Sequence, residues 1–198
     1  LSANRRLHAA PADLAGPAPG LDAAARALAM LAQAPLFAGV PRAELAALAE
    51  RGRYVRFADG ERIMRETDPG ETMFLILDGR ARVLSVKDGR ESELYAHGPG
   101  EVVGHMSALT GAPRFATVRA DGHLEMVEFG KDALAPLMRA HPEAAEMAAK
   151  EIVRIADKVR ALDAQARAAP GAAEPAPVLG RLVERIRVFF GDGHRSVT

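Results

Sequence analysis

The feature of this sequence that most constrains its fold is a series of Asp-Gly pairs between short runs of β-forming residues. Because Asp-Gly supplies the positive φ angles that two-residue hairpins require, each pair predicts a point where a strand reverses. The pairs stand at 59–60, 78–79, 88–89 and 121–122, and a further tight turn is expected at 68–70. The runs between these turns predict eight strands, at 54–57, 62–65, 73–77, 82–86, 93–96, 101–103, 115–119 and 125–129. Several short strands at this spacing are typical of an antiparallel sandwich or barrel.

Helical periodicity precedes the β region. Apolar residues at helical spacing predict one helix over 21–33. A second helix over 41–50 begins with Pro41, a residue that suits the first helical turn. One short helix between 104 and 110 is expected to interrupt the strands. Residues 1–20 are rich in Ala, Pro and Gly without periodicity, which is typical of a linker.

Helices also follow the β region, over 131–139 and over 142–163. The longer one carries an apolar seam with a period of about 3.5 residues, formed by Ala148, Ile152, Ile155, Val159 and Leu162. This seam favours a lid packed on its own barrel, with a dimeric coiled coil as the alternative. An Ala-Pro linker over 168–177 then leads to an amphipathic helix over 178–190, which would dock on a protein surface or lie on a membrane.

The composition limits the chemistry that the chain can perform. The 198 residues include no cysteine, which excludes disulfides, thiolate catalysis and cysteine-ligated zinc. The formal net charge is zero, which argues against a surface built broadly for nucleic acid. The sequence has no nucleophile elbow and no metal-ligand spacing among its histidines, so His97 and the others outside 103–118 are expected at the surface or in turns. We therefore expect no enzyme activity, no metal, no cofactor and no nucleic-acid partner.

The most informative stretch, 103–118, combines a glycine, a short helix and an arginine. Gly104 permits close backbone approach, and the N-terminus of the helix that follows offers unpaired N–H groups and a partial positive charge, which favour an anion. Arg114 follows Pro113 at the start of a strand, from where a guanidinium can make a bidentate contact to a phosphate. The stretch therefore predicts a pocket for one compact phosphate inside a β-barrel.

The same stretch resembles the phosphate-binding cassette of the cyclic-nucleotide-binding domain family, written Phe-Gly-Glu-(Leu/Ile/Met)-(Ala/Ser)-Leu and then Pro-Arg-x-Ala-Thr. The match keeps its register without a gap, turn glycines upstream agree, and the resemblance covers roughly residues 34–163. It implies an α+β fold: an eight-stranded antiparallel β-roll, or jelly-roll-like barrel, with N-terminal helices, a short phosphate-binding helix and two C-terminal helices, the second a lid. The chain then divides into 1–33 (Ala/Pro linker and N-terminal helix), 34–163 (cyclic-nucleotide-binding domain) and 164–198 (Ala/Pro linker and amphipathic terminal helix).

The resemblance also implies a ligand site. Arg114 would bind the cyclic phosphate, and backbone N–H groups near Met106, Ser107 and Phe115 would complete its cradle. Val83 and Tyr95, at two barrel positions, would face the base of the ligand. That ligand is expected to be cAMP rather than cGMP. The predicted site comprises Val83, Tyr95, Gly104, His105, Met106, Ser107, Arg114, Phe115 and Thr117.

Two positions depart from the family pattern. His105 stands where the family has the glutamate that accepts the ribose 2′-hydroxyl, and Phe115 stands where Ala, Ser or Thr follows the arginine. Losing a hydrogen bond to a charged group would weaken binding ~10- to 100-fold, so the pocket is expected to be weakened, altered or lost. Phe115 also lacks the hydroxyl that favours cGMP in some relatives. If His105 faces the ligand, binding should tighten as the pH falls from about 8 to about 6.

Three kinds of protein would carry such a domain. The cassette and the closing Arg-Ile-Arg-Val-Phe-Phe resemble the C-terminal regulatory domains of bacterial mechanosensitive-type channels with cyclic-nucleotide modules. On this hypothesis a channel domain of the same chain lies upstream, the domain lies at the cytoplasmic face of the inner membrane, and it can form a homo-oligomer. The alternatives are a degenerate domain that binds no nucleotide and serves oligomerisation or protein contact, and the sensor half of a truncated transcription factor.

Overall fold

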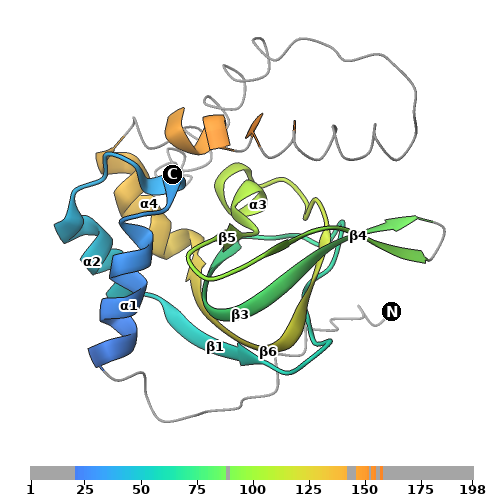
Figure 1. Ribbon diagram of the computed structural model, residues 1–198. Coiled ribbons are helices and arrows are strands. Elements are labelled where there is room, and N and C mark those ends of the chain that lie inside the picture. Colours follow the sequence, from blue (N-terminus) through green and yellow to red (C-terminus); the bar gives the residue numbers. More distant parts are fainter. Residues whose placement is uncertain (1–20, 88–89, 142–145, 152, 155–156, 158–198) are drawn as a thin grey trace, which may run out of the picture.

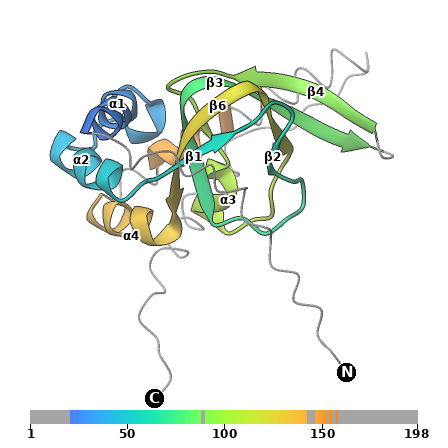
Figure 2. The same cartoon turned by 90° about the horizontal axis from the view of Figure 1, so that it is seen from below.

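The computed structural model describes residues 21–87, 90–141, 146–151, 153, 154 and 157. A curved antiparallel sheet forms its centre, and helices α1, α2 and α4 gather on one side of that sheet (Figures 1 and 2). The short helix α3 lies apart from these three helices, against β3 (Figure 1). The elements in chain order are α1 (Leu21–Leu31), η1 (Pro35–Phe37), α2 (Arg42–Glu50), β1 (Arg53–Phe57), β2 (Arg62–Met64), β3 (Thr72–Lys87), β4 (Arg90–His97), β5 (Val102–Val103), α3 (His105–Thr110), β6 (Thr117–Gly130) and α4 (Lys131–Ala140).

The strands pair in the order β1-β6-β3-β4, with β2 added to β6 and β5 added to β3. All these pairings are antiparallel. The two long strands β3 and β6 are the central strands of the sheet, because each pairs with several other strands along its length. This arrangement confirms the predicted α+β fold with an antiparallel β-roll and flanking helices.

The strand count differs from the prediction because two of the Asp-Gly pairs do not reverse the chain. The predicted strands 73–77 and 82–86 are both parts of β3, and 115–119 and 125–129 both fall largely in β6. Gly79 and Gly122 have φ angles of 86° and 76°, and the register between β3 and β6 shifts next to Asp78. These glycines therefore form bulges at which two paired strands bend together, and eight predicted strands become six.

The Asp-Gly pair at 59–60 forms a turn between β1 and β2, as predicted. Gly60 has a φ of 73°, and the Glu61 carboxylate accepts the Ala58 N–H at 2.9 Å. The pair at 88–89 lies outside the described residues.

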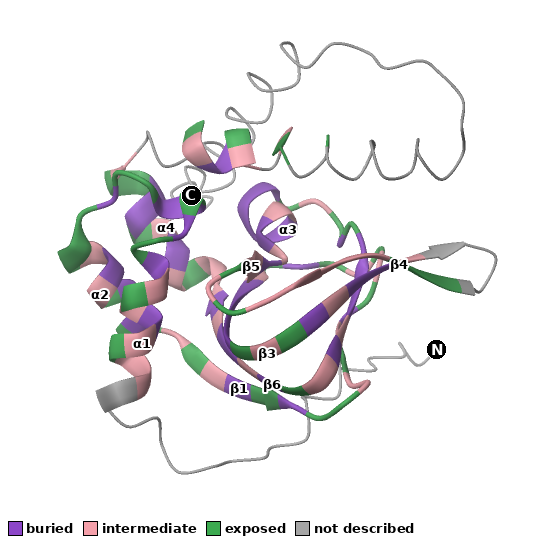
Figure 3. Ribbon diagram, in the orientation of Figure 1, coloured by how far each residue is buried: buried purple, intermediate pink, exposed green. Residues whose placement is uncertain are grey.

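The core divides into two clusters because the central strands are covered on both faces. Side chains of β3 alternate between them: Leu75 packs toward the helices, while Phe74 and Ile76 point into the barrel. A strand buried on both faces is a continuous apolar run, which explains the unbroken sequence Met73-Phe74-Leu75-Ile76-Leu77. Figure 3 shows buried residues where the helices meet the sheet and along most of α3.

The helices lie close to their predicted positions. Pro41 directly precedes the first residue of α2, and Gly104 and Gly111, both in the left-handed region, bound α3. Of the predicted lid helix over 142–163, residues 146–151 are helical. Ala148 and Ala149 are buried in the core cluster that also contains side chains of α1, α2 and α4. The remainder of its seam, the linkers over 1–20 and 168–177, and the helix over 178–190 lie outside the described residues.

Candidate functional site

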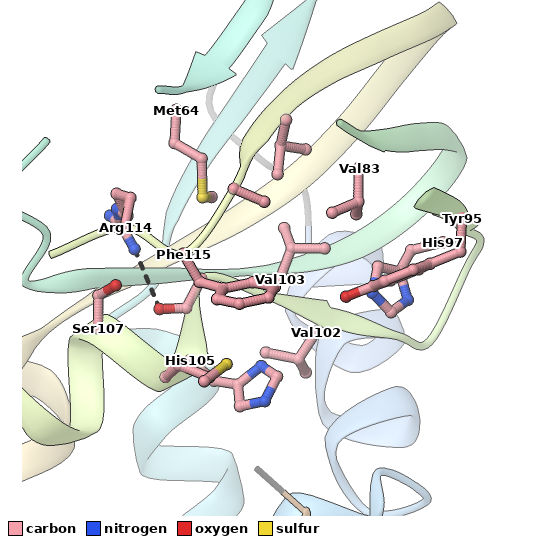
Figure 4. Close-up of a pocket in the computed structure, with 14 residues that line it drawn as sticks. Met64, Val83, Tyr95, His97, Val102, Val103, His105, Ser107, Arg114 and Phe115 are labelled. Carbon is pink, nitrogen blue, oxygen red and sulfur yellow. Dashed lines mark hydrogen bonds between the residues drawn. The ribbon is translucent and has the colours of Figure 1, made fainter. Parts of the chain in front are cut away.

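A cavity lies between the long strands and the segment that carries α3 (Figure 4). Its volume is about 50 Å³, and it is partly open to solvent. Eight of the nine predicted site residues line it, all except Thr117. The lining residues are Met64, Val83, Tyr95, His97, Val102, Val103, Gly104, His105, Met106, Ser107, Arg114, Phe115, Ala116 and Val118.

One row of paired residues crosses four strands and forms the apolar wall of the cavity. Met64 of β2 pairs with Val118 of β6, Val118 pairs with Val83 of β3, and Val83 pairs with Tyr95 of β4. Side chains in such a row point to the same face of the sheet. The fold therefore places residues from distant parts of the sequence side by side inside the barrel.

The guanidinium of Arg114 lies at the end of the cavity remote from Tyr95 (Figure 4) and is held by three hydrogen bonds. Arg114 is 7% exposed, and its Nη1 donates to the carbonyl oxygens of Thr72 at 2.6 Å and Gly104 at 3.0 Å. Its Nη2 donates to the Thr72 hydroxyl at 2.9 Å. A guanidinium has five N–H groups, so Nε–H and one N–H of Nη2 make no hydrogen bond to the described residues. These two groups share one edge of the guanidinium and are spaced for two oxygens of a phosphate or carboxylate.

Two glycines let the backbone approach this guanidinium. A Cβ on Gly70 would lie 2.2 Å from Nε of Arg114, and one on Gly104 would lie 2.6 Å from Nη1. The backbone of Arg114 is fixed as well, because its N–H donates to Asp68 O at 2.8 Å and its carbonyl accepts the Thr67 N–H at 2.9 Å. One glycine of the turn at 68–70 and one of the cassette thus pack directly against the arginine.

The cavity favours an anion. Arg114 is the permanent cation among its lining residues, and none of them is a carboxylate. Burial lowers the pKa of Arg114 from its ordinary value, while Glu128 and Asp68 oppose this effect. Since an arginine pKa is far above neutrality, the side chain stays charged in the buried site.

The first turn of α3 forms another wall. His105, Met106 and Ser107 line the cavity, and the first N–H groups of a helix have no partner within that helix. The Ser107 hydroxyl donates to Pro113 O at 3.1 Å, which ties the start of α3 to the residue before Arg114. The turn and the arginine are therefore parts of one rigid unit.

His105 lines the cavity but its ring is buried. It is 5% exposed, and burial lowers its pKa to about 4, although the nearby Glu151 favours the charged form. Figure 4 shows its ring pointing away from Arg114 and toward Val102. Among the described residues neither ring nitrogen makes a hydrogen bond of normal geometry, although the Val102 backbone lies near enough to favour protonation. The buried ring is therefore neutral near pH 7, and the conditional expectation that binding tightens between pH 8 and pH 6 stays a prediction.

The end of the cavity remote from Arg114 is aromatic and includes a histidine for which the sequence predicted a place at the surface or in a turn. The side chain of His97 is 12% exposed, lies 3.1 Å from the Glu101 carboxylate, and makes an edge contact with Tyr95 at 5.1 Å between ring centroids. Burial and Glu101 raise the pKa of Tyr95, so its hydroxyl stays protonated at neutral pH. His97 follows Tyr95 by two positions on β4, and this period of two was the signal for its place.

Thr117 lies outside the cavity. It is 2% exposed, and its hydroxyl accepts the Glu66 N–H at 3.0 Å. Its role in the structure is to join the start of β6 to the end of the 62–66 segment. Thr117 is thus a structural residue in the described arrangement, and its predicted ligand contact is not supported by its position.

The described part of the chain contains no group of three or more acidic, histidine or cysteine side chains placed to hold a metal ion. In the same residues, no helix has the length and hydropathy needed to cross a membrane.

Comparison with known proteins identifies the segment that holds the cavity. The model of the family described as "Cyclic nucleotide-binding domain" matches residues 54–141. A CRP-like cAMP-activated global transcriptional regulator of Mycobacterium tuberculosis is 29% identical over 126 residues, which cover 63% of this chain and 56% of the relative. A cAMP-dependent protein kinase regulatory subunit of Blastocladiella emersonii is 32% identical over 111 residues, 56% of this chain and 28% of the relative. The match thus spans about half of the first relative's length and less of the second.

Solved structures share the fold. The N-terminal domain of a transcriptional regulator from Streptomyces coelicolor is similar with a TM-score of 0.55 and 29% identity, over 66% of this chain and 92% of that one. The regulatory domain of Toxoplasma gondii PKA, crystallised with cAMP, has the same fold with a TM-score of 0.59 and 21% identity, over 74% of this chain and 60% of that one. The chain therefore contains a domain of the cyclic nucleotide-binding family over residues 54–141.

Proposed function

We propose that this domain is a regulatory sensor that binds a cyclic nucleotide, with cAMP as its preferred ligand, and that it catalyses no reaction. The observation that carries the proposal is the guanidinium of Arg114, buried at one end of a cavity without carboxylates and left with two N–H groups on one edge. A cyclic phosphate has one negative charge and two exocyclic oxygens, which match this edge. The names of both curated relatives refer to cAMP, which supports cAMP as the ligand.

The other predicted contacts complete this proposal. Backbone N–H groups of Met106 and Ser107 in the first turn of α3, together with that of Phe115, would bind the phosphate. Gly104 would let the ligand approach the backbone. Val83 and Tyr95 would face the base from the opposite wall. The ribose hydroxyl would lack its usual carboxylate partner, because the neutral ring of His105 points away from Arg114 (Figure 4).

Isothermal calorimetry with cAMP, cGMP and cyclic dinucleotides tests the proposal. We expect a micromolar or weaker Kd for cAMP, and at least a tenfold loss in Arg114→Ala, because a charge-assisted bidentate contact is among the strongest in proteins. Arg119→Ala is the matched control, since Arg119 is bound by Glu91 outside the cavity. Absence of binding by the folded wild-type domain would favour the degenerate, non-binding alternative.

The output that the domain controls is a separate proposal. The resemblance of the cassette to channel-associated domains favours control of a membrane channel from the cytoplasmic side of the inner membrane. The named relatives favour transcriptional control or kinase regulation instead. Membrane fractionation of the native protein, together with a DNA-binding assay with and without cAMP, separates these outputs. The prediction that the chain has no nucleic-acid partner depends on the same assay.

A further inference from the structure

One large apolar side chain of the described residues is exposed. Phe115 is 45% exposed, and it is the exposed large hydrophobic residue of the described chain. It does not lie on an open surface, because it belongs to the lining of the cavity. Figure 4 shows its ring lying across the middle of the cavity, between Arg114 and Tyr95. An aromatic ring left accessible inside a concavity marks a surface for a ligand.

The position of this ring relative to the arginine is fixed by the backbone. The two hydrogen bonds of the Arg114 main chain, to Asp68 and Thr67, hold the residue directly before Phe115. The residue directly after it, Ala116, is 6% exposed and packs in the barrel cluster. The position of the Phe115 ring therefore varies mainly through its two side-chain torsions. Because Phe115 directly follows Arg114, the ring stays near the guanidinium.

We propose that Phe115 provides the face on which the base of a bound cyclic nucleotide stacks, and that it makes the site selective for purines over pyrimidines. This inference rests on the proposed function, because it takes Arg114 as the phosphate contact. A phosphate on the free edge of Arg114 directs the rest of the ligand along the cavity toward Val83 and Tyr95, and Phe115 lies on that path (Figure 4). Base–aromatic stacking needs only a π face, which every base has.

The chemistry of the ring determines which ligands it can distinguish. Phenylalanine has no donor or acceptor, so it offers adenine and guanine the same contact. A purine has two fused rings and overlaps more of the phenyl face than a pyrimidine does, so it gains more dispersion and buries more apolar area. Selection at Phe115 therefore acts on the size of the base, while any preference for adenine over guanine has to come from other residues.

The test compares four ligands, cAMP, cGMP, cCMP and cUMP, by calorimetry on wild type, Phe115→Ala and Phe115→Trp. Wild type should bind the two purine ligands at least about tenfold more tightly than the pyrimidine ligands. Phe115→Ala should weaken purine binding by about 5- to 100-fold and change pyrimidine binding far less, while Phe115→Trp should keep the purine preference. Because the side chain is exposed, the alanine variant should remain folded, which circular dichroism checks.

Other outcomes overturn the inference in distinguishable ways. Purine binding that is unchanged or tighter in Phe115→Ala, with Arg114→Ala still defective, would remove Phe115 from the base contact and leave the proposed function standing. Binding by Phe115→Ala when wild type binds none of the four would mean that the ring fills the base site. No binding by any of the three proteins would overturn the proposed function itself, and the stacking role with it.

Discussion

The guanidinium of Arg114 holds Thr72 by both of its oxygen atoms: Nη1 donates to the carbonyl at 2.6 Å and Nη2 donates to the hydroxyl at 2.9 Å. The two residues are 42 positions apart in the sequence, so this contact joins the cassette to the start of β3. A free arginine side chain has about 2 kcal/mol of rotamer entropy. Attachment at two points removes that freedom during folding, and the ligand meets a guanidinium that is already oriented.

Thr72→Val tests this orientation. Valine keeps the shape and the backbone carbonyl of residue 72 but removes the hydroxyl, so Nη2 of Arg114 loses its partner. We expect the Kd for cAMP to rise about 3- to 10-fold, which corresponds to one hydrogen bond of about 1 kcal/mol. Calorimetry measures the change.

Thr117→Val is the matched control for Thr72→Val, because its buried hydroxyl accepts a backbone N–H outside the cavity. That variant should lose about 1–2 kcal/mol of unfolding free energy and keep its affinity for cAMP. If both valine variants bound cAMP as wild type does, Thr72 would have no part in orienting Arg114.

Gly70→Ala should damage the site through a single methyl group. The new Cβ would lie 2.2 Å from Nε and 2.4 Å from Cζ of Arg114, and the three hydrogen bonds of the guanidinium leave it little room to move. We expect at least a tenfold loss of cAMP affinity. Gly98→Ala is the control, since a Cβ at Gly98 meets no atom within 4 Å. Equal affinity of the two variants would show that Arg114 tolerates displacement.

The sequence predicted the type and place of the elements well but not the continuity of the strands. Asp-Gly has the same local preference in a hairpin and in a bulge, since both need a positive φ. At 59–60 the chain turns, whereas at 78–79 it continues, because β6 bends beside β3 and keeps the ladder paired. That choice depends on a partner strand far away in the sequence, and local patterns do not contain it.

Gly79→Ala and Gly122→Ala test the bulge and differ in one respect. Both glycines have positive φ angles, so each alanine costs about 1–2 kcal/mol of backbone strain. A Cβ at Gly79 would in addition lie 2.2 Å from the carbonyl oxygen of His123, whereas a Cβ at Gly122 meets nothing within 4 Å. Gly79→Ala should therefore be less stable than Gly122→Ala by a further ~1–3 kcal/mol in urea unfolding. Equal losses would mean that β6 moves away from β3 at little cost.

Part of the candidate site could be predicted from one local motif, and part depends on contacts between residues far apart in the sequence. The cassette residues Gly104 to Ser107 and Arg114 were predictable, because one contiguous motif contains them. Met64 was not predictable, because it enters the cavity through its pairing with Val118, and register is set by the assembled sheet. Thr117 was predicted by its place in the motif, yet its hydroxyl points to Glu66.

The buried imidazole of His105 should make the stability of the domain depend on pH. Its folded pKa of about 4 lies below the ordinary 6.5, chiefly because burial disfavours the charged ring. The nearby charges are Glu151, which opposes this effect, and His97 and Arg154, which add to it. Above pH 6.5 the ring is neutral in both the folded and the unfolded chain, so it adds no pH dependence there. Below pH 6.5 the unfolded chain binds a proton that the folded chain excludes, and stability falls.

We therefore expect wild type to lose up to about 3 kcal/mol of unfolding free energy through His105 as the pH falls from about 6.5 to about 4. Urea unfolding at several pH values measures this slope. His105→Gln should have a shallower slope, whatever its absolute stability, because glutamine does not titrate. His123→Gln is the control: His123 has a side chain that is 61% exposed, so its loss should leave the steep slope in place. Identical slopes in all three proteins would mean that His105 titrates normally in the folded chain, and that water reaches its ring.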